Sequence, residues 1–267
     1  MSTTAIALSD QPRWQQAARF ATLPLVLLVL WQAWASTLPP ESPAPAPLRV
    51  ARAAVDLVMN GGLISATAQS LGRVVLGFLC ALVLGVTLGM LMGYSRTLRE
   101  NLDPLIESFR PIAPMALLPV AILWLGTGTP TALAIVCYAA FFPVLVNTVH
   151  GVRRVDRKLV LVSHTMGVSR FAILTRVILP GAATSILLGA RLAMGVAWTA
   201  IIAAELAVGA KSGGGGSGGI GQMMFVFYAY SIDLNAIVVC MIVVGIVALL
   251  IDRIFRAVEH RLIPWRH

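Results

Sequence analysis

Long apolar runs alternate with short polar stretches along almost the whole chain. A helix needs about 20 mostly apolar residues to cross a bilayer, and six runs approach that length. The first run covers 20–37 and follows a polar tail at 1–19. The other five lie within a core at 63–255, and they cover 71–93, 104–125, 131–149, 182–206 and 234–255. The pattern predicts an all-α, polytopic membrane protein with about six transmembrane helices.

The segments between the runs differ in character. Residues 38–62 begin with the Pro-rich stretch PPESPAPAP and are interpreted as an external linker, and 207–221 form a Gly-rich external loop. The apolar segment 220–230 is too short to span a bilayer, which indicates a re-entrant or interfacial helix. The triplet Ala33–Ala35 resembles a signal-peptidase site, but because more spans follow, an uncleaved first helix is the better interpretation. Residues 256–267 form a basic C-terminal tail.

Small residues and prolines mark the runs that pack against protein. Two stripes repeat every fourth residue, at Gly77, Ala81, Gly85, Gly89 and Gly93, and at Gly181, Ser185, Gly189, Ala193 and Ala197. Such stripes let helices approach closely in lipid. The third run holds four prolines and the fourth is interrupted by Pro143. Irregular backbone of this kind is expected to face protein or a water-filled cavity.

Composition and charge agree with a membrane protein. Of the 267 residues, 58% are hydrophobic and 12% are charged, about half of the usual charged fraction. Most of the 20 Lys and Arg residues lie in the two tails, after the second run and in 150–180, which all fall on one side of the membrane if six runs cross it. The segments on the other side hold only Arg49, Arg52 and Lys211. The positive-inside rule therefore places both termini and 150–180 in the cytoplasm. It also explains the net charge of +9 without a nucleic-acid partner.

Residues with potential chemistry show no catalytic or metal-binding pattern. The three cysteines lie inside apolar runs and are interpreted as packing residues, and the four histidines lack a metal spacing. No Ser, Cys or Asp has a neighbour that would activate it as a nucleophile. The sequence therefore predicts a device that moves a solute, with no metal site, no cofactor of its own and no enzymatic activity.

The segment 150–180 is predicted to form a cytoplasmic docking loop. Apolar positions recur at a helical period, and Gly167 followed by Ser169 indicates one short helix that ends and another that begins. An apolar side then remains free to bind a partner. The predicted docking residues are Leu161, Val162, Ser163, His164, Met166, Gly167, Arg170, Val177, Leu179 and Pro180.

The spacing from Gly167 to the Val177–Pro180 tetrapeptide resembles the "EAA" loop of ABC importer permeases. In this chain Leu161, Val162 and Ser163 occupy the place of the Glu-Ala-Ala triplet. Other stretches resemble the nitrate, sulfonate, taurine and bicarbonate branch of that binding-protein-dependent family: 109–116 (FRPIAPMA), 141–152, 189–198 (GARLAMGVAW) followed by Ala204-Glu205, and Pro264-Trp265.

The resemblance implies a permease subunit of a bacterial inner-membrane importer with the type I (MetI-like) fold and a cytoplasmic coupling helix. The implied partners are two ATPase subunits that bind ATP and Mg, an external solute-binding protein, a second permease copy or paralogue, and lipid. The implied solute is a small anion such as nitrate, taurine or another sulfonate, bicarbonate or a carboxylate. The alternatives are a secondary transporter or channel, which usually shows repeated halves, and a membrane enzyme, which needs a polar catalytic cluster.

Five polar or aromatic residues in the spans are candidates for the translocation path: Arg110, Asn147, Arg191, Trp198 and Glu205. For Arg110 the ordinary alternative is an ion pair with Glu107, three residues earlier on the same helix face. Arg191 has no acid within reach on its own helix. A charge at that depth needs a partner, so either another span, a second subunit or the translocated anion faces Arg191.

Overall fold

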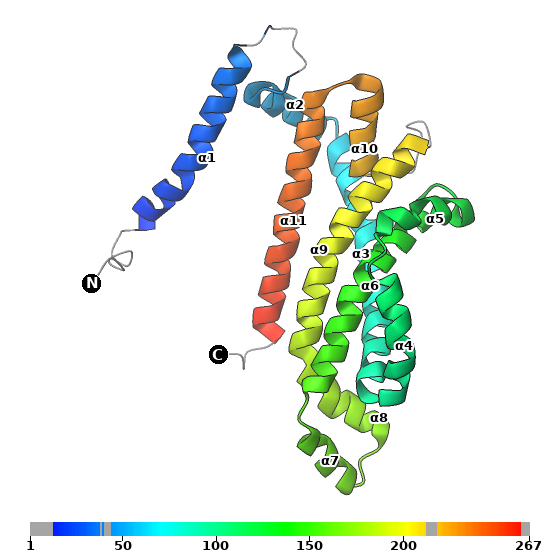
Figure 1. The fold of residues 1–267 in the computed structure, drawn as a ribbon. Coiled ribbons are helices and arrows are strands. Elements are labelled where there is room, and N and C mark those ends of the chain that lie inside the picture. Colours follow the sequence, from blue (N-terminus) through cyan, green and yellow to red (C-terminus); the bar gives the residue numbers. More distant parts are fainter. Residues whose placement is uncertain (1–12, 38, 40–43, 212–217, 263–267) are drawn as a thin grey trace, which may run out of the picture.

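The computed structural model describes residues 13–37, 39, 44–211 and 218–262, and within them every regular element is a helix (Figure 1). The first half contains α1 (Arg13–Ser36), α2 (Pro47–Met59), α3 (Gly62–Tyr94), α4 (Arg96–Phe109), the 3-10 turn η1 (Pro114–Leu117), α5 (Leu118–Leu125) and α6 (Thr129–Arg154). The second half contains α7 (Arg157–Thr165), α8 (Arg170–Ile173), the π-helical turn η2 (Leu174–Ile178), α9 (Leu179–Lys211), α10 (Ile220–Val226), a second π-helical turn η3 (Phe227–Ser231) and α11 (Leu234–Leu262).

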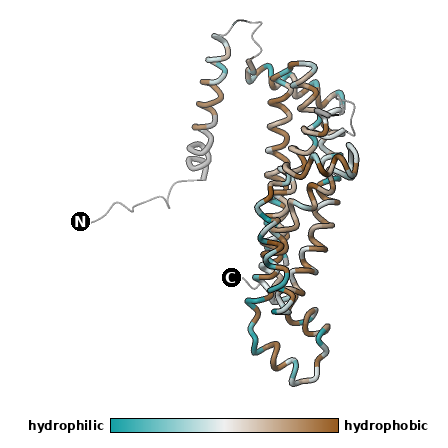
Figure 2. Tube along the Cα trace, turned by 45° about the vertical axis from the view of Figure 1, so that its right-hand side comes forward, coloured by the Kyte–Doolittle hydropathy of each residue, from teal (hydrophilic) through white to brown (hydrophobic). Residues whose placement is uncertain are grey.

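The long helices form a bundle, and the all-α polytopic prediction is confirmed. In the described residues four helices are long and apolar enough to cross a membrane: α3, α6, the continuous stretch Arg170–Gly209 that includes α9, and α11. The α4–α5 pair, bent by 84°, counts as a fifth if it is one span. Helix α1 lies where the first run predicted a span and stands apart from the bundle (Figure 1). Figure 2 shows that hydrophobic residues dominate the long helices and that hydrophilic residues gather near the α7 end.

The small-residue stripes lie where helices meet. A Cβ added at Gly77, Gly85 or Gly89 of α3 would lie 2.7 to 2.9 Å from the side chains of the α6 residues Val136, Val144 and Thr148 respectively. Because these partners advance along α6 in step with the glycines, the two helices run in the same direction. The α9 stripe meets α6 from the other side, where a Cβ at Gly189 would collide with Asn147. The core of the bundle is therefore the α3–α6–α9 layer.

Several predicted boundaries differ from the structure. The segment interpreted as a linker at 38–62 contains α2, whose Val50 is buried against α11 residues Val239 and Cys240. The Gly-rich loop predicted at 207–221 is shorter, because α9 continues to Lys211 and α10 begins at Ile220; its residues 212–217 lie outside the described part. Helix α11 continues to Leu262 into the predicted tail.

The prolines act differently in the third and fourth runs. The predicted irregular run at 104–125 is indeed broken, because the chain bends between α4 and α5. Pro143, by contrast, does not interrupt α6, which continues from Thr129 to Arg154. The apolar segment 220–230 forms the short α10–η3 unit, which packs its N-terminal end against α9.

Candidate functional site

The segment 150–180 folds as the sequence predicts, into two short helices joined by a turn. Asp156 begins α7 by accepting a hydrogen bond from the backbone N–H of Lys158 (2.9 Å), and Ser169 begins α8 by accepting one from Ala172 (3.3 Å). Between the helices Gly167 has φ +71°, a left-handed conformation that glycine adopts without strain. The turn thus depends on this glycine.

Five large apolar side chains of this segment are exposed. Besides Leu159 they are the four that form what we call the docking surface: Leu161, Val162, Met166 and Phe171. Met166 and Phe171 are each 76% exposed. Exposed apolar side chains gathered on short helices are typical of a surface that binds another protein. Phe171 is absent from the predicted docking residues, although its position in the apolar pattern would have identified it.

Of the other predicted docking residues, some are exposed at the surface and others pack against the bundle beneath it. His164, Arg170 and Pro180 are exposed, and the half-buried Ser163 donates a hydrogen bond to the carbonyl of Leu159 (2.8 Å). Val177 and Leu179 instead point inward, where they pack around the buried residues Met90, Val152, Ile173, Ile178 and Ala182. They support the docking surface from beneath.

Two of the five path candidates line a common pocket. Arg110 and Asn147 border an open pocket of about 430 Å³ between the α4–α5 bend, α6 and α9, and Tyr138 also lines it. A second pocket of about 260 Å³ shares Arg110 and extends toward the α7 end. The described structure contains no ion pair between Arg110 and Glu107, so that predicted pairing is wrong. Arg110 follows the last residue of α4, at the bend, and so lies at the pocket rather than within a straight helix.

Arg191 finds its partners on another span, which was one of the predicted alternatives. Its guanidinium forms an ion pair with Asp252 of α11 (2.6 Å) and lies 3.8 Å from Glu259. Trp198 is 2% exposed and donates its indole N–H to the carbonyl of Val244 (3.1 Å). Both residues join α9 to α11, and neither lines the two pockets at Arg110.

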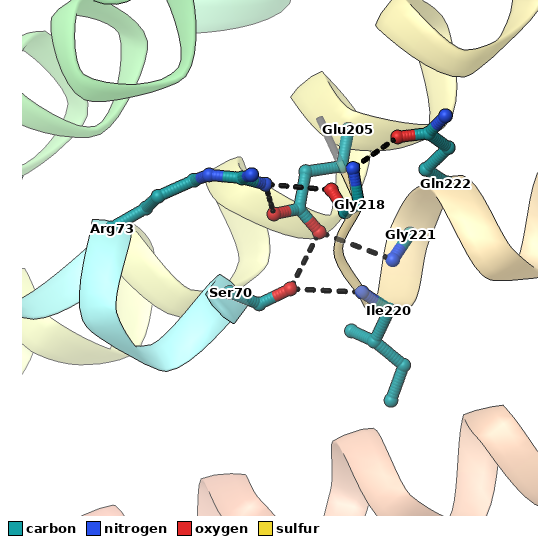
Figure 3. Close-up of polar contacts among 7 residues, drawn as sticks. All are labelled: Ser70, Arg73, Glu205, Gly218, Ile220, Gly221 and Gln222. Atoms are coloured by element: carbon teal, nitrogen blue, oxygen red, sulfur yellow. Dashed lines mark hydrogen bonds and ion pairs between the residues drawn. The ribbon is translucent and has the colours of Figure 1, made fainter. Parts of the chain in front are cut away.

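Glu205 lies in a buried polar cluster at the α10 end of the bundle (Figure 3). One carboxylate oxygen accepts from Arg73 (2.6 Å) and the other from Ser70 (2.6 Å) and from the backbone N–H of Gly221 (3.1 Å). Arg73 also donates to the carbonyl of Gly218 (2.7 Å), and Ser70 accepts from the N–H of Ile220 (2.9 Å).

This cluster fixes the start of α10 to α3 and α9. The side chains of Arg73 and Glu205 are 8% and 3% exposed, so the pair is shielded from water. A Cβ at Gly219 would collide with the Glu205 carboxylate, which shows how closely the backbone approaches. Sequence reasoning placed Glu205 among path residues and left Arg73 without a role. The sequence did contain a signal for this ion pair, because Arg73 and Glu205 lie on different spans and neither has an oppositely charged partner on its own helix.

No group of three or more His, Cys, Asp or Glu side chains in the described part of the chain has the arrangement of a metal site.

Comparisons with known proteins agree with this geometry. Residues 59–264 match the family described as the binding-protein-dependent transport system inner membrane component. The taurine transport system permease protein TauC of Escherichia coli is 34% identical over 94% of this chain and 90% of its own length. The bicarbonate transport system permease protein CmpB of Synechococcus elongatus is 32% identical over 92% of this chain and 90% of its own.

A solved structure shows the same fold. It is titled as an inward-facing conformation of the MetNI methionine ABC transporter, and it matches with a TM-score of 0.64 at 18% identity, over 76% of this chain and 97% of the other. The family match covers most of the described helices, including the docking surface and the buried polar cluster. The chain therefore belongs to the family of inner membrane components of binding-protein-dependent transport systems, the permease subunits of ABC importers.

Proposed function

We propose that this permease pairs with a second permease chain and carries a small anion along the Arg110 pocket between them. The observation that carries the proposal is Arg110, a cation that lines an open pocket without an ion-pair partner among the described residues. Asn147 and Tyr138 add polar groups to the same wall. A second chain would close the open side.

The proposed substrate class rests on Arg110, the charged residue among those that line this pocket. Taurine, other sulfonates, nitrate, bicarbonate and carboxylates are all small and carry a negatively charged group that a guanidinium binds well. Two relatives named for taurine and bicarbonate fit this class. Arg191 is not needed for the proposal, because Asp252 already balances its charge.

Substitution of Arg110 tests the anion proposal. We expect Arg110→Gln to lower uptake of the anionic substrate at least tenfold in reconstituted transporters, and Arg110→Lys to restore part of it, because lysine keeps the charge without the planar geometry. Thr127→Ala, at an exposed position beyond α5, is the control for expression and assembly. Undiminished uptake by Arg110→Gln, or a cationic substrate, would contradict the proposal.

Two ATPase subunits, which bind ATP and Mg, would each bind the docking surface of one permease chain, whereas this chain would bind no cofactor of its own. ATP binding would draw the ATPase subunits together, and α7 and α8 would transmit that motion to α6 and α9. Such a cycle requires two packings of the bundle whose balance ATP shifts. An external solute-binding protein would deliver the substrate at the α10 end.

This arrangement requires the α7 end to face the cytoplasm, together with both termini. The C-terminal end of α11 lies toward α7, in agreement with the basic residues of both segments (Figure 1). In a variant without native cysteines, Ser169→Cys should react with a membrane-impermeant thiol reagent only after lysis, and Asn60→Cys should react in intact cells. Reaction of Ser169→Cys in intact cells would show that the orientation is the opposite of the one proposed.

A further inference from the structure

Tyr138 of α6 contacts the break between α4 and α5 with its side-chain hydroxyl. The hydroxyl donates to the backbone carbonyl of Phe109 (2.7 Å) and, at a longer distance, to that of Ile112 (3.3 Å). These two carbonyls lie on either side of Arg110 in the chain. A side chain of a neighbouring helix is thus hydrogen-bonded to the backbone around the cation on which the proposed function depends.

The break leaves carbonyls without the donors that a continuous helix would give them. The prolines of this run have no N–H to donate, and the N–H of Ala116 donates to Ala113 (2.9 Å) instead of Ile112. The N–H of Ile112 donates to Phe109 (3.1 Å), which closes a tighter turn. Carbonyls freed at membrane depth need another donor, and the hydroxyl of Tyr138 supplies one.

The ordinary explanation is that this hydroxyl only satisfies backbone groups. It does not account for the place of the bond. Prolines permit a bend without fixing its angle, whereas a contact with another helix fixes it. The pair α4–α5 is bent by 84°, Arg110 lies at the bend, and Arg110 and Tyr138 line the same pocket. A small rotation at the bend would therefore displace the guanidinium within that pocket.

The hydroxyl of Tyr138 is not available to bind an anion in this structure. A phenol has one O–H proton, and here the proton is directed at backbone carbonyls. The lone pairs that remain on the oxygen would repel an anion. The ring is held as well, by an edge-to-face contact with Phe142 in which the ring centroids are 5.1 Å apart. In this conformation Tyr138 therefore acts on a bound anion through the position of Arg110.

We propose that Tyr138 is a positioning residue for transport, whose hydroxyl fixes the bend between α4 and α5 so that the guanidinium of Arg110 faces the anion. A guanidinium binds an anion through paired N–H donors in one plane, and a displacement of about 1 Å weakens such an arrangement strongly. The effect of Tyr138 on transport rests on the proposed function, whereas its effect on the bend does not.

Hydrogen–deuterium exchange of the complete transporter tests the bend without any substrate. Tyr138→Phe removes the hydroxyl and keeps the ring. The backbone N–H groups of 112–117 should exchange about fivefold faster in this variant, because the bend is held less firmly. Ser108→Ala is the matched control, because the hydroxyl of Ser108 also donates to a carbonyl at 2.7 Å, that of Pro104, but within α4. Its exchange should stay within about twofold of wild type.

Uptake tests the link to Arg110. The probe is whichever of taurine, nitrate and bicarbonate the wild-type transporter carries fastest. Tyr138→Phe should lower the uptake per ATP hydrolysed about fivefold, because Arg110 is displaced. The double variant Arg110→Gln/Tyr138→Phe should match Arg110→Gln within about twofold, since a residue that acts through Arg110 then has nothing left to position. Ser108→Ala should transport like wild type.

Unchanged exchange in Tyr138→Phe would overturn the proposal. So would effects on uptake that multiply in the double variant, because the hydroxyl would then act independently of Arg110. A Tyr138→Phe variant that fails to fold, or that is less stable with unchanged uptake, would assign the bond to folding alone. Full uptake by Arg110→Gln together with faster exchange in Tyr138→Phe would instead contradict the proposed function, and only the effect on the bend would stand.

Discussion

Replacing Glu205 with alanine is expected to lower the stability of the permease by about 3–5 kcal/mol, because a buried guanidinium then loses its carboxylate. Arg73 would lose its carboxylate partner but keep the carbonyl of Gly218, and Ser70 would lose its acceptor. The N–H of Gly221 would lose a partner as well. The start of α10 should therefore separate from α3 and α9 before the rest of the bundle unfolds.

Thermal unfolding in detergent and limited proteolysis around residues 225–230 measure these two effects. Glu100→Ala is the control, because it removes an acid from the exposed pair with Arg96, and such pairs contribute about 0–1 kcal/mol. Arg73→Leu combined with Glu205→Leu should lose less stability than Glu205→Ala, since no charge remains buried. A Glu205→Ala variant as stable as Glu100→Ala would show that the buried polar cluster does not hold α10.

Features encoded by neighbouring residues could be predicted from the sequence. Runs of apolar residues located α3, α6, α9 and α11, and the glycine stripes located the faces on which α3 meets α6. The two short helices of 150–180 were predictable because the residues that start and end them are close together in the sequence. Gly167 supplies a left-handed turn and Ser169 a helix start within three residues of each other.

Features that depend on distant residues could not be derived in this way. Arg191 and Asp252 are 61 residues apart, and Arg73 and Glu205 are 132 apart, so no local period shows that they meet. Helix α2 was missed for a related reason. Its apolar face is short, follows a Pro-rich stretch and is explained only by the surface of α11 that covers it.

The two most exposed side chains of the docking surface should decide whether the transporter assembles. Met166 and Phe171 are each 76% exposed, on either side of the turn at Gly167. If both enter an apolar groove of an ATPase subunit, burying them contributes about 1.5–3 kcal/mol each. Met166→Asp/Phe171→Asp also places two charges there without partners. We therefore expect copurification of the ATPase subunits to fall at least a hundredfold, with the permease still inserted in the membrane.

The matched control is Asn60→Asp, which places a charge at an exposed position between α2 and α3, far from α7 (Figure 1). It should leave copurification unchanged.

Gly167→Leu is a milder test of the same surface, because a side chain at φ +71° costs about 1–2 kcal/mol and has open space around it. The strain should shift the turn rather than remove the surface, so the ATPase subunits should remain bound while substrate-stimulated ATPase activity falls about tenfold. Normal assembly of the double variant, with full stimulation in Gly167→Leu, would mean that the ATPase subunits bind elsewhere on the permease.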